Sequence, residues 1–323
     1  MHLIDRIFSI HSEESFEKTA LEVFRFQYEH NFIYRTFADS LGKSNPKSLT
    51  EIPFLPIGFF KTHSVISCDQ ENIELTFLSS GTTDSTRSKH LIHSASIYEK
   101  SFEASYRKFI GNPEEQVILG LLPNYIEQGN SSLVYMVDKL IHLSQSNLSG
   151  FMLNELESVK SIYSEAIYSG KKVVIFGVSY ALLDLAEKGT DLSQALIIET
   201  GGMKGRRAEL TKEELHQELI NGLNVPFVSS EYGMTELLSQ AYSNKEGLFI
   251  EPNWMKILIR DTNDPLSYVS AGKSGGINVI DLANVYSCSF IATQDLGKII
   301  DNKFQLLGRF DNADIRGCNL MVE

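Results

Sequence analysis

The sequence predicts an α/β fold, with a mainly parallel sheet core, flanking helices and a smaller strand-rich subdomain. Between about residues 61 and 250, buried-strand patterns alternate with helical patterns, and polar loops that contain glycine follow several of the strands. Beyond about residue 250, strand patterns dominate. We therefore expect an N-terminal helical segment with a connector (1–60), the α/β core (61–250), the strand-rich subdomain (251–310) and a C-terminal tail (311–323).

The N-terminal segment is predicted to be helical and to be followed by an extended connector. Residues 13–42 carry apolar side chains at roughly helical spacing among charged ones. These apolar positions are Phe16, Ala20, Val23, Phe24, Tyr28 and Phe32. The segment PKSLTEIPFLPIGFF (46–60) contains three prolines, which favour an extended chain over a helix.

The core and the subdomain are predicted from hydrophobic periodicity. The core strand candidates are IELTFL (73–78), QVILGLLP (116–123), KKVVIFGVS (171–179), ALIIETGG (195–202) and VPFVSS (225–230). The core helix candidates are SSLVYMVDKLIHLS (131–144), YALLDLAEKG (180–189) and LTKEELHQELINGL (210–223). In the last helix, Thr211 and Glu214 are spaced as a capping box. The subdomain strand candidates are KILIRD (256–261), GGINVIDL (275–282), SCSFIATQD (287–295) and KFQLLG (303–308).

The composition argues against several classes of protein. The formal net charge of −12 disfavours nucleic acid or an anionic membrane as a general partner. Three isolated cysteines, Cys68, Cys288 and Cys318, indicate neither a disulfide framework nor a zinc site. The N-terminus has acidic residues where a signal peptide needs an apolar run, and the most apolar stretch is too short to span a bilayer. We therefore expect a cytoplasmic protein without a membrane span, whose oligomeric state the sequence leaves open.

Three polar loops are predicted to follow strands, at the edge where open α/β sheets bind ligands: Ser79–Lys89, Thr200–Gly205 and Ser229–Glu236. In the first, seven of the ten residues from Ser79 to Ser88 carry a hydroxyl, and Arg87 and Lys89 add charge. Hydroxyls and backbone N–H groups of such a loop can hold phosphate oxygens, although a solvated surface turn is the alternative. The loop does not have the Walker spacing.

The segment SSEYGMTELL (229–238) offers several groups suited to a nucleotide. The ring of Tyr232 can stack on a base, Thr235 supplies a hydroxyl, and Glu236 is a hard oxygen ligand for Mg²⁺. The alternative is a helix N-terminus, where acidic residues are favoured. Further along, Asp295 is expected in a turn after a strand, where it accepts ribose hydroxyls or simply caps the turn. Arg309 lies in a GRFD segment that is also compatible with a surface ion pair.

The order of these motifs resembles that of the adenylate-forming enzyme superfamily. The hydroxyl-rich loop, TGGMKG, YGMTE, TQDLG and GRFDNADIRG follow one another over about residues 77–317. The chain is still more similar to the acyl-protein synthetase family of bacterial luminescence operons (the LuxE type). That similarity includes the segment LPNYIEQGNSSLVYMV (122–137) and a cysteine close to the C-terminus. Phenylacetate–CoA ligases are the next family that it resembles.

The resemblance implies that ATP and Mg²⁺ convert a carboxylic acid, in this family a fatty acid, into an acyl adenylate. It assigns nucleotide contacts to Ser80, Gly81, Thr82, Thr83, Arg87, Lys89, Gly201, Gly202, Tyr232, Asp295 and Arg309. Thr235 would contact the α-phosphate and Glu236 would bind Mg²⁺. Relatives line their acyl pocket where this chain has Tyr125, Leu133, Tyr135 and Met136.

Two departures separate the chain from the wider superfamily. Asp84 replaces a usual glycine, and only about a dozen residues follow Asp311, so we expect the large-domain fold without the mobile C-terminal domain. The family resemblance makes Cys318 the acyl acceptor, with Arg316 nearby to lower its pKa. An acyl-accepting or reductase protein would then be a partner.

Two alternatives to this function stay open. One is a CoA ligase completed by another chain, and the other is a nucleotide-binding interaction subunit without turnover. His63, His90 and His93 are assigned to structure or surface because the sequence offers no partner for them, and Cys288 is assigned to the core.

Overall fold

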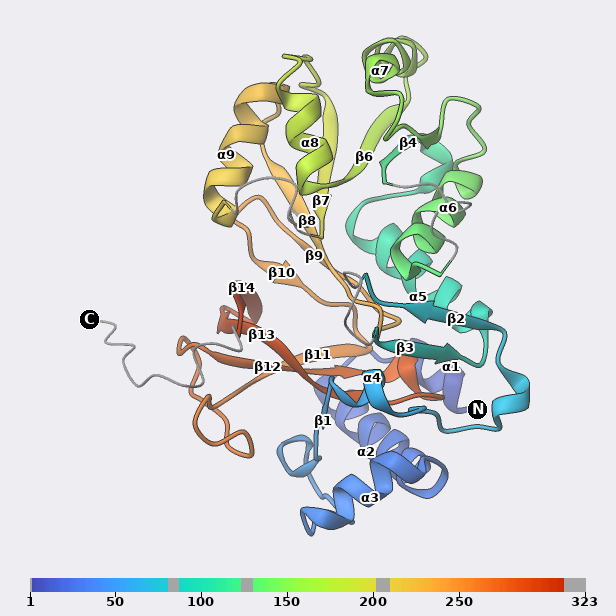
Figure 1. Ribbon diagram of the computed structural model, residues 1–323, viewed down its shortest axis with the longest axis vertical. Helices are drawn as coiled ribbons and strands as arrows, with labels where there is room; N and C mark the ends of the chain where they lie inside the picture. Colours follow the sequence, from blue (N-terminus) through green and yellow to red (C-terminus); the bar gives the residue numbers. More distant parts are fainter. Residues whose placement is uncertain (1, 81–86, 123–129, 202–209, 311–323) are drawn as a thin grey trace. The chain divides into compact units, whose positions relative to one another are not determined.

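The computed structural model describes residues 2–80, 87–122, 130–201 and 210–310, and the chain divides into two compact units (Figure 1). Unit 1 combines Met1–Asp69 with Asn253–Glu323, and unit 2 is Gln70–Pro252. The N-terminal segment and the strand-rich segment therefore belong to one compact unit, although about 180 residues separate them in the sequence. The division into four segments stays a prediction.

Unit 2 is built on a mainly parallel sheet. Its parallel strands lie in the order β5-β4-β6-β7-β8. They are β4 (Gln116–Leu121), β5 (Gly150–Phe151), β6 (Lys172–Val178), β7 (Ala195–Thr200) and β8 (Val228–Tyr232). The antiparallel strands β9 (Ala241–Ser243) and β10 (Phe249–Ile250) extend it beyond β8. Strand β4 is buried throughout, which explains its apolar sequence run. The predicted α/β fold class is confirmed.

Five α-helices accompany this sheet within the described part of unit 2. They are α5 (Ala95–Phe109), α6 (Ser132–Ser144), α7 (Val159–Tyr168), α8 (Ser179–Ala186) and α9 (Lys212–Leu223). Helix α9 begins as predicted, because Thr211 and Glu214 form a capping box. Helices α8 and α9 pack side by side (Figure 1), and a Cβ atom at Gly222 would lie only 2.7 Å from the Cβ of Ala186. Glycine thus permits the close approach of the two helices.

The hydroxyl-rich segment occupies a different place from the one predicted. Strands β2 (Leu75–Leu78) and β3 (Lys89–Ile92) form a separate antiparallel pair. The hydroxyl-rich segment therefore joins the two strands of this hairpin and does not follow a strand of the parallel sheet. The pair packs against the helices of unit 2, since the ring of Phe77 contacts Tyr98 on α5 and Tyr135 on α6. This packing accounts for the apolar character that made β2 look like a core strand.

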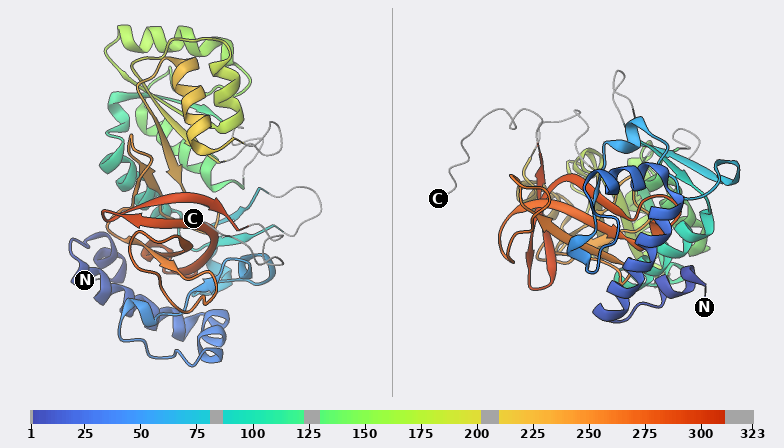
Figure 2. Two further views of the ribbon diagram at one scale, coloured as in Figure 1. Left: turned by 90° about the vertical axis from the view of Figure 1, so that its left-hand side faces the viewer. Right: turned by 90° about the horizontal axis from the view of Figure 1, so that it is seen from below.

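Unit 1 contains an antiparallel sheet, visible as the orange and red strands of Figure 2. Its strands are β11 (Met255–Arg260), β12 (Gly275–Asp281), β13 (Phe290–Ile300) and β14 (Lys303–Arg309), with β1 (Leu55–Pro56) parallel to β13. The prediction that Asp295 lies in a turn is wrong, because β13 continues through it to Ile300. The chain turns instead at Asp301 and Asn302, whose φ angles are 48° and 59°.

The helices of unit 1 lie in its N-terminal part. They are α1 (Leu3–Phe8), α2 (Glu13–His30), α3 (Phe32–Ser40) and α4 (Phe59–Thr62). The helical segment predicted over residues 13–42 is confirmed, but it consists of two helices, because Asn31 is extended (φ −104°, ψ 102°) and its side chain caps α3. Phe24 packs on Phe290 of β13 as expected for the buried face, but Phe32 is 67% exposed because it belongs to the second helix.

Short 3₁₀ turns complete the chain. They are η1 (Leu49–Glu51), η2 (Gln70–Asn72), η3 (Pro113–Glu115), η4 (Leu156–Ser158) and η5 (Leu282–Asn284). The predicted connector (46–60) is therefore not extended throughout, because it contains η1 and the first residues of α4. In the part of the chain that the structure covers, no helix has the length and apolarity that crossing a membrane requires.

We expect Asn31→Ala to lower the free energy of unfolding of unit 1 by about 2–3 kcal/mol. Asn31 is fully buried, accepts a hydrogen bond from the Tyr34 amide at 3.0 Å and donates one to the Ser287 carbonyl at 3.0 Å. Urea unfolding followed by the fluorescence of the chain's single tryptophan, Trp254, reports on this unit. The exposed Asn45→Ala is the control, and equal midpoints for the two variants would contradict the assignment.

Candidate active site

The carboxyl ends of three neighbouring parallel strands bring polar residues to one edge of unit 2. Strands β6, β7 and β8 are in parallel register, so Val178 lies beside Thr200 and Glu199 lies beside Ser230. Because parallel strands end at the same edge, the polar segments that follow them meet there. Two of the three predicted polar loops, those after β7 and β8, therefore start from this edge.

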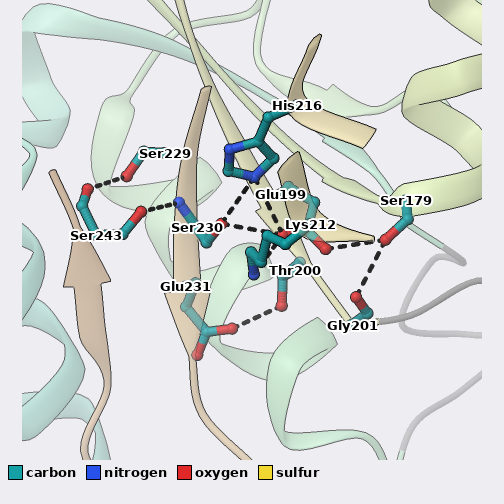
Figure 3. A network of polar contacts seen from close by, with 10 residues as sticks. All are labelled: Ser179, Glu199, Thr200, Gly201, Lys212, His216, Ser229, Ser230, Glu231 and Ser243. Carbon is teal, nitrogen blue, oxygen red and sulfur yellow. Dashed lines mark hydrogen bonds and ion pairs between the residues drawn. The ribbon is translucent and has the colours of Figure 1, made fainter. Parts of the chain in front are cut away.

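Glu199 is the centre of a buried polar network at that edge (Figure 3). Its side chain is almost fully buried, and it accepts hydrogen bonds from Ser179 Oγ at 2.9 Å and from Ser230 Oγ at 3.0 Å. Lys212 Nζ lies 3.0 Å from Oε2, and His216 Nε2 lies 3.9 Å from the same oxygen. Burial acts to raise the pKa of Glu199, but His216, Lys212 and Ser179 together hold that pKa at about 2. The carboxylate is therefore ionised at neutral pH.

The same network fixes both ends of the loop after β7. Ser179 Oγ lies 3.1 Å from the carbonyl oxygen of Gly201, which is the first residue of that loop. Lys212 is the first residue of α9, at the far end of the loop, and its ammonium group pairs with Glu199. Gly201 has a φ of 73°, which glycine adopts without strain. Gly202, the other predicted adenine-loop glycine, lies outside the described residues.

A second carboxyl group, Glu231, lies close to the first (Figure 3). Thr200 Oγ1 donates a hydrogen bond to Glu231 Oε2 at 2.6 Å. The pKa of Glu231 is raised to about 7, mainly by its removal from water and also by the Glu199 carboxylate, while Thr200 and Lys212 oppose the rise. A Cβ atom at Gly233 would lie 2.2 Å from Glu231 Oε1, so the carboxyl group occupies the space that a side chain there would need.

The YGMTE segment follows β8 and is well packed. Tyr232 is the last residue of β8 and is 5% exposed, with its ring 6.0 Å from that of Phe249. No helix begins between residues 233 and 240, so the alternative interpretation of this segment as a helix N-terminus is excluded. Thr235 is half-buried and Glu236 is buried. The segment is therefore a structured loop at the carboxyl edge of the sheet.

Contacts from outside the motif also reach this loop. His90 Nδ1 lies 2.7 Å from the carbonyl oxygen of Thr235, and Ser101 Oγ on α5 lies 3.0 Å from Ser239 Oγ. Sequence reasoning assigned His90 only to structure or surface, and it did not select Glu199, Lys212, His216 or Glu231 at all. The available signal was that Glu199 stands inside a predicted strand, directly before a polar loop, and that Glu231 directly follows another predicted strand.

The remaining predicted nucleotide contacts are distributed between the two units. In unit 2, Ser80, Arg87 and Lys89 of the hydroxyl-rich segment are exposed. In unit 1, Asp295 is 8% exposed, pairs with Arg309 across the β13–β14 ladder, and lies 3.3 Å from Arg309 Nε. Within the hydroxyl-rich segment, Gly81, Thr82, Thr83 and Asp84 lie outside the described residues. Asp311 and Arg316 also lie outside them.

Three of the four residues predicted for the acyl pocket, Leu133, Tyr135 and Met136, belong to α6. Tyr135 donates a hydrogen bond from its hydroxyl to Glu99 Oε1 at 2.6 Å, and Met136 is buried, whereas Leu133 is half-buried. Tyr125 lies outside the described residues. So does Cys318, the predicted acyl acceptor.

The raised pKa of Glu231 predicts a pH-dependent stability. The folded state holds a proton on Glu231 that the unfolded state releases, so stability falls as pH rises from about 4.5 to about 7 and then levels off. We expect this fall to be about 2 kcal/mol and to be absent in Glu231→Gln. Unfolding midpoints between pH 4.5 and 8.5 measure it, with the exposed Glu246→Gln as control. Parallel profiles for wild type and Glu231→Gln would rule out the shifted pKa.

The sequence is similar to that of known proteins over almost its whole length. The family described as "Acyl-protein synthetase, LuxE" matches residues 8–323. A long-chain-fatty-acid–luciferin-component ligase of Vibrio harveyi is 22% identical over 93% of this chain and 85% of its own length.

Solved structures share the fold. A 2-hydroxyisobutyryl-CoA ligase in the postadenylation state superposes with a TM-score of 0.67, at 11% identity over 95% of this chain and 70% of that one. ATP-bound MatB from Rhodopseudomonas palustris superposes with a TM-score of 0.56, at 17% identity over 76% of this chain. The chain spans about half the length of MatB, 49%. These similarities confirm the fold that the motif order predicted, and the LuxE match, which covers almost the whole sequence, establishes that this chain belongs to the acyl-protein synthetase family.

Proposed function

We propose that this protein uses ATP to activate a fatty acid as its acyl adenylate and passes the acyl group to a protein thiol. The observation that carries the proposal is the gathering, at one edge of unit 2, of the Gly201 loop and the Thr235–Glu236 segment in a chain of the LuxE family. The name of the Vibrio harveyi relative supports a long-chain fatty acid as the substrate class.

The first step joins two anions, so the site has to position them and to neutralise their charge. An oxygen of the fatty acid carboxylate attacks the α-phosphorus, a new P–O bond forms, and the bond to the pyrophosphate leaving group breaks. The chain carries a net charge of −12, so local cations are needed. Arg87 and Lys89, both exposed beside the hydroxyl-rich segment, are the proposed cations, and Ser80, Thr82 and Thr83 supply hydroxyls.

We propose that the rest of the nucleotide is held by the residues that the family resemblance named. Tyr232, with Gly201 and Gly202, takes the adenine ring, and Thr235 contacts the α-phosphate. For the ribose hydroxyls, the proposed partner is the Asp295 carboxylate, which forms an ion pair with Arg309 Nε at 3.3 Å. Tyr125, Leu133, Tyr135 and Met136 remain the proposed acyl-pocket residues.

Glu236 is the proposed ligand of Mg²⁺. In the described parts of the chain, no group of three or more His, Cys, Asp or Glu side chains could hold a metal ion. A single carboxylate suits a metal that is held jointly with the phosphates, as Mg²⁺ commonly is. When bound, Mg²⁺ neutralises phosphate charge and acts as a Lewis acid.

Cys318 is the proposed acceptor in the second step. Its thiolate attacks the acyl carbon, the C–S bond forms, the C–O bond to AMP breaks, and AMP leaves. The two cysteines that the structure describes are poor acceptors. Burial and Asp69 raise the pKa of Cys68 to about 11, and burial raises that of Cys288 to about 12, so neither is a thiolate at neutral pH. A reductase that collects the acyl group is the proposed partner protein.

A CoA acceptor is the second candidate, favoured by the fold similarity to a CoA ligase over 95% of this chain. Thioester formation with added CoA by the purified protein alone would favour this candidate over the protein thiol.

We expect Glu236→Gln to lower fatty-acid-dependent pyrophosphate exchange by about 100-fold or more, because Mg²⁺ would lose its proposed carboxylate ligand. Hydroxylamine trapping of the adenylate gives an independent readout over a panel of carboxylic acids. The matched control is Glu213→Gln, an exposed carboxyl group at the start of α9, which should leave exchange unchanged. Wild-type protein that exchanges with no acid in the panel would refute the proposed function.

For the second step, we expect radiolabelled fatty acid and ATP to leave an acid-stable acyl label on the wild-type chain. Cys318→Ala should lose this label while pyrophosphate exchange continues, because only the acceptor is removed. Cys68→Ala is the matched control and should retain the label. If Cys318→Ala is labelled like wild type, the acceptor lies elsewhere.

A further inference from the structure

His90 connects two segments of unit 2 that lie far apart in the sequence. It belongs to β3, its side chain is fully buried, and its Nδ1 atom lies 2.7 Å from the carbonyl oxygen of Thr235. A carbonyl oxygen can only accept a hydrogen bond, so Nδ1 carries the hydrogen and donates it. At this distance the hydrogen bond is short and well formed.

One end of this connection is fixed at the base of the hydroxyl-rich hairpin. The Ser79 amide donates to the Ser88 carbonyl at 3.0 Å, and the Ser88 amide donates to Ser79 Oγ at 2.9 Å. Lys89 and His90 then continue in the β2–β3 ladder, opposite Leu78 and Phe77. The imidazole is therefore attached to a rigid pair of strands, directly beside the segment proposed to hold phosphates.

The other end is the peptide bond that joins Thr235 to Glu236. Leu237 and Leu238, which follow, are buried, and Ser239 contacts Ser101 on α5. The loop is thus anchored after Glu236 by packing and before it by β8. His90 holds the carbonyl group between those anchors, which fixes the orientation of the peptide from which the Glu236 side chain projects.

We propose that His90 is a positioning residue for activation, whose Nδ1–H group holds the Thr235–Glu236 peptide in register with the hydroxyl-rich hairpin. The proposal deepens the proposed function, since it assigns to His90 the alignment of Glu236 with the phosphate-binding segment. A buried histidine that only fills space would contribute to stability in the same way whichever ring nitrogen carried the hydrogen. The positioning role therefore requires a hydrogen-bond donor at the place of Nδ1, whereas a space-filling role does not.

A pair of substitutions separates these roles. The side-chain amide of Asn places its N–H where His has Nδ1, whereas the amide of Gln places it near Nε2. We expect His90→Asn to keep pyrophosphate exchange within about threefold of wild type. We expect His90→Gln to lower kcat by about 10- to 100-fold with KM for ATP changed by less than about threefold, because a misplacement of about 1 Å costs on this scale.

The unfolding midpoints of the two variants are measured alongside the kinetics. Equal rates of pyrophosphate exchange in His90→Asn and His90→Gln, whether high or low, would overturn the positioning role of His90 and leave the proposed function intact. A loss of kcat that simply follows the loss of stability in both variants would also overturn it.

A second measurement keeps the proposal testable if the proposed function itself fails. If wild-type protein exchanges pyrophosphate with no acid, amide hydrogen exchange of residues 233–240 is compared without ligand. Faster amide hydrogen exchange in His90→Gln than in His90→Asn supports the proposal that the His90 hydrogen bond holds this loop. Equal amide hydrogen exchange in the two variants refutes that proposal.

Discussion

A buried carboxylate has to be surrounded by donors, and in unit 2 this requirement at Glu199 determines the arrangement of the sheet edge. Ser179 at the start of α8, Lys212 at the start of α9 and Ser230 on β8 all point at this one group. Because each partner comes from a different element, the ends of β6, β7 and β8 and the starts of two helices are held together by one charge. The loop after β7 begins and ends within this arrangement, so that the positions of Gly201 at its start and of Lys212 beyond its end are both fixed.

The parts of the fold that local patterns determine were predictable from the sequence. Strand β6 (Lys172–Val178) is buried on both faces and therefore appears in the sequence as a continuous apolar run. The start of α9 is predicted by the capping-box spacing of Thr211 and Glu214. The break at Asn31 was not predictable, because its partner Ser287 lies 256 residues away and periodicity continues across it. The extension of β13 past Asp295 likewise depends on pairing with β14.

The candidate site divides in the same way. Motif order was enough to select Tyr232, Thr235 and Glu236, since those residues lie within one short segment of the chain. Glu231 and His90 required the structure, because the contacts of Glu231 with Thr200 and of His90 with the Thr235 carbonyl join residues that are far apart in the sequence. The three selected residues, proposed to bind the nucleotide and Mg²⁺, thus belong to one local motif, whereas the residues that hold this motif in place come from other parts of the sequence.

The contact between Glu231 and Gly233 restricts the residue that this edge can carry at position 233. A Cβ atom at position 233 and the Glu231 carboxyl group claim the same volume. A side chain at position 233 would therefore displace the Glu231 carboxyl group from its place beside Thr200, and it would also press on Gln240 Cγ, 3.3 Å from the same point. The glycine of the YGMTE segment thus leaves room for the side chain of its neighbour, and a substitution there would act on the protonated carboxyl group before it acted on the turn.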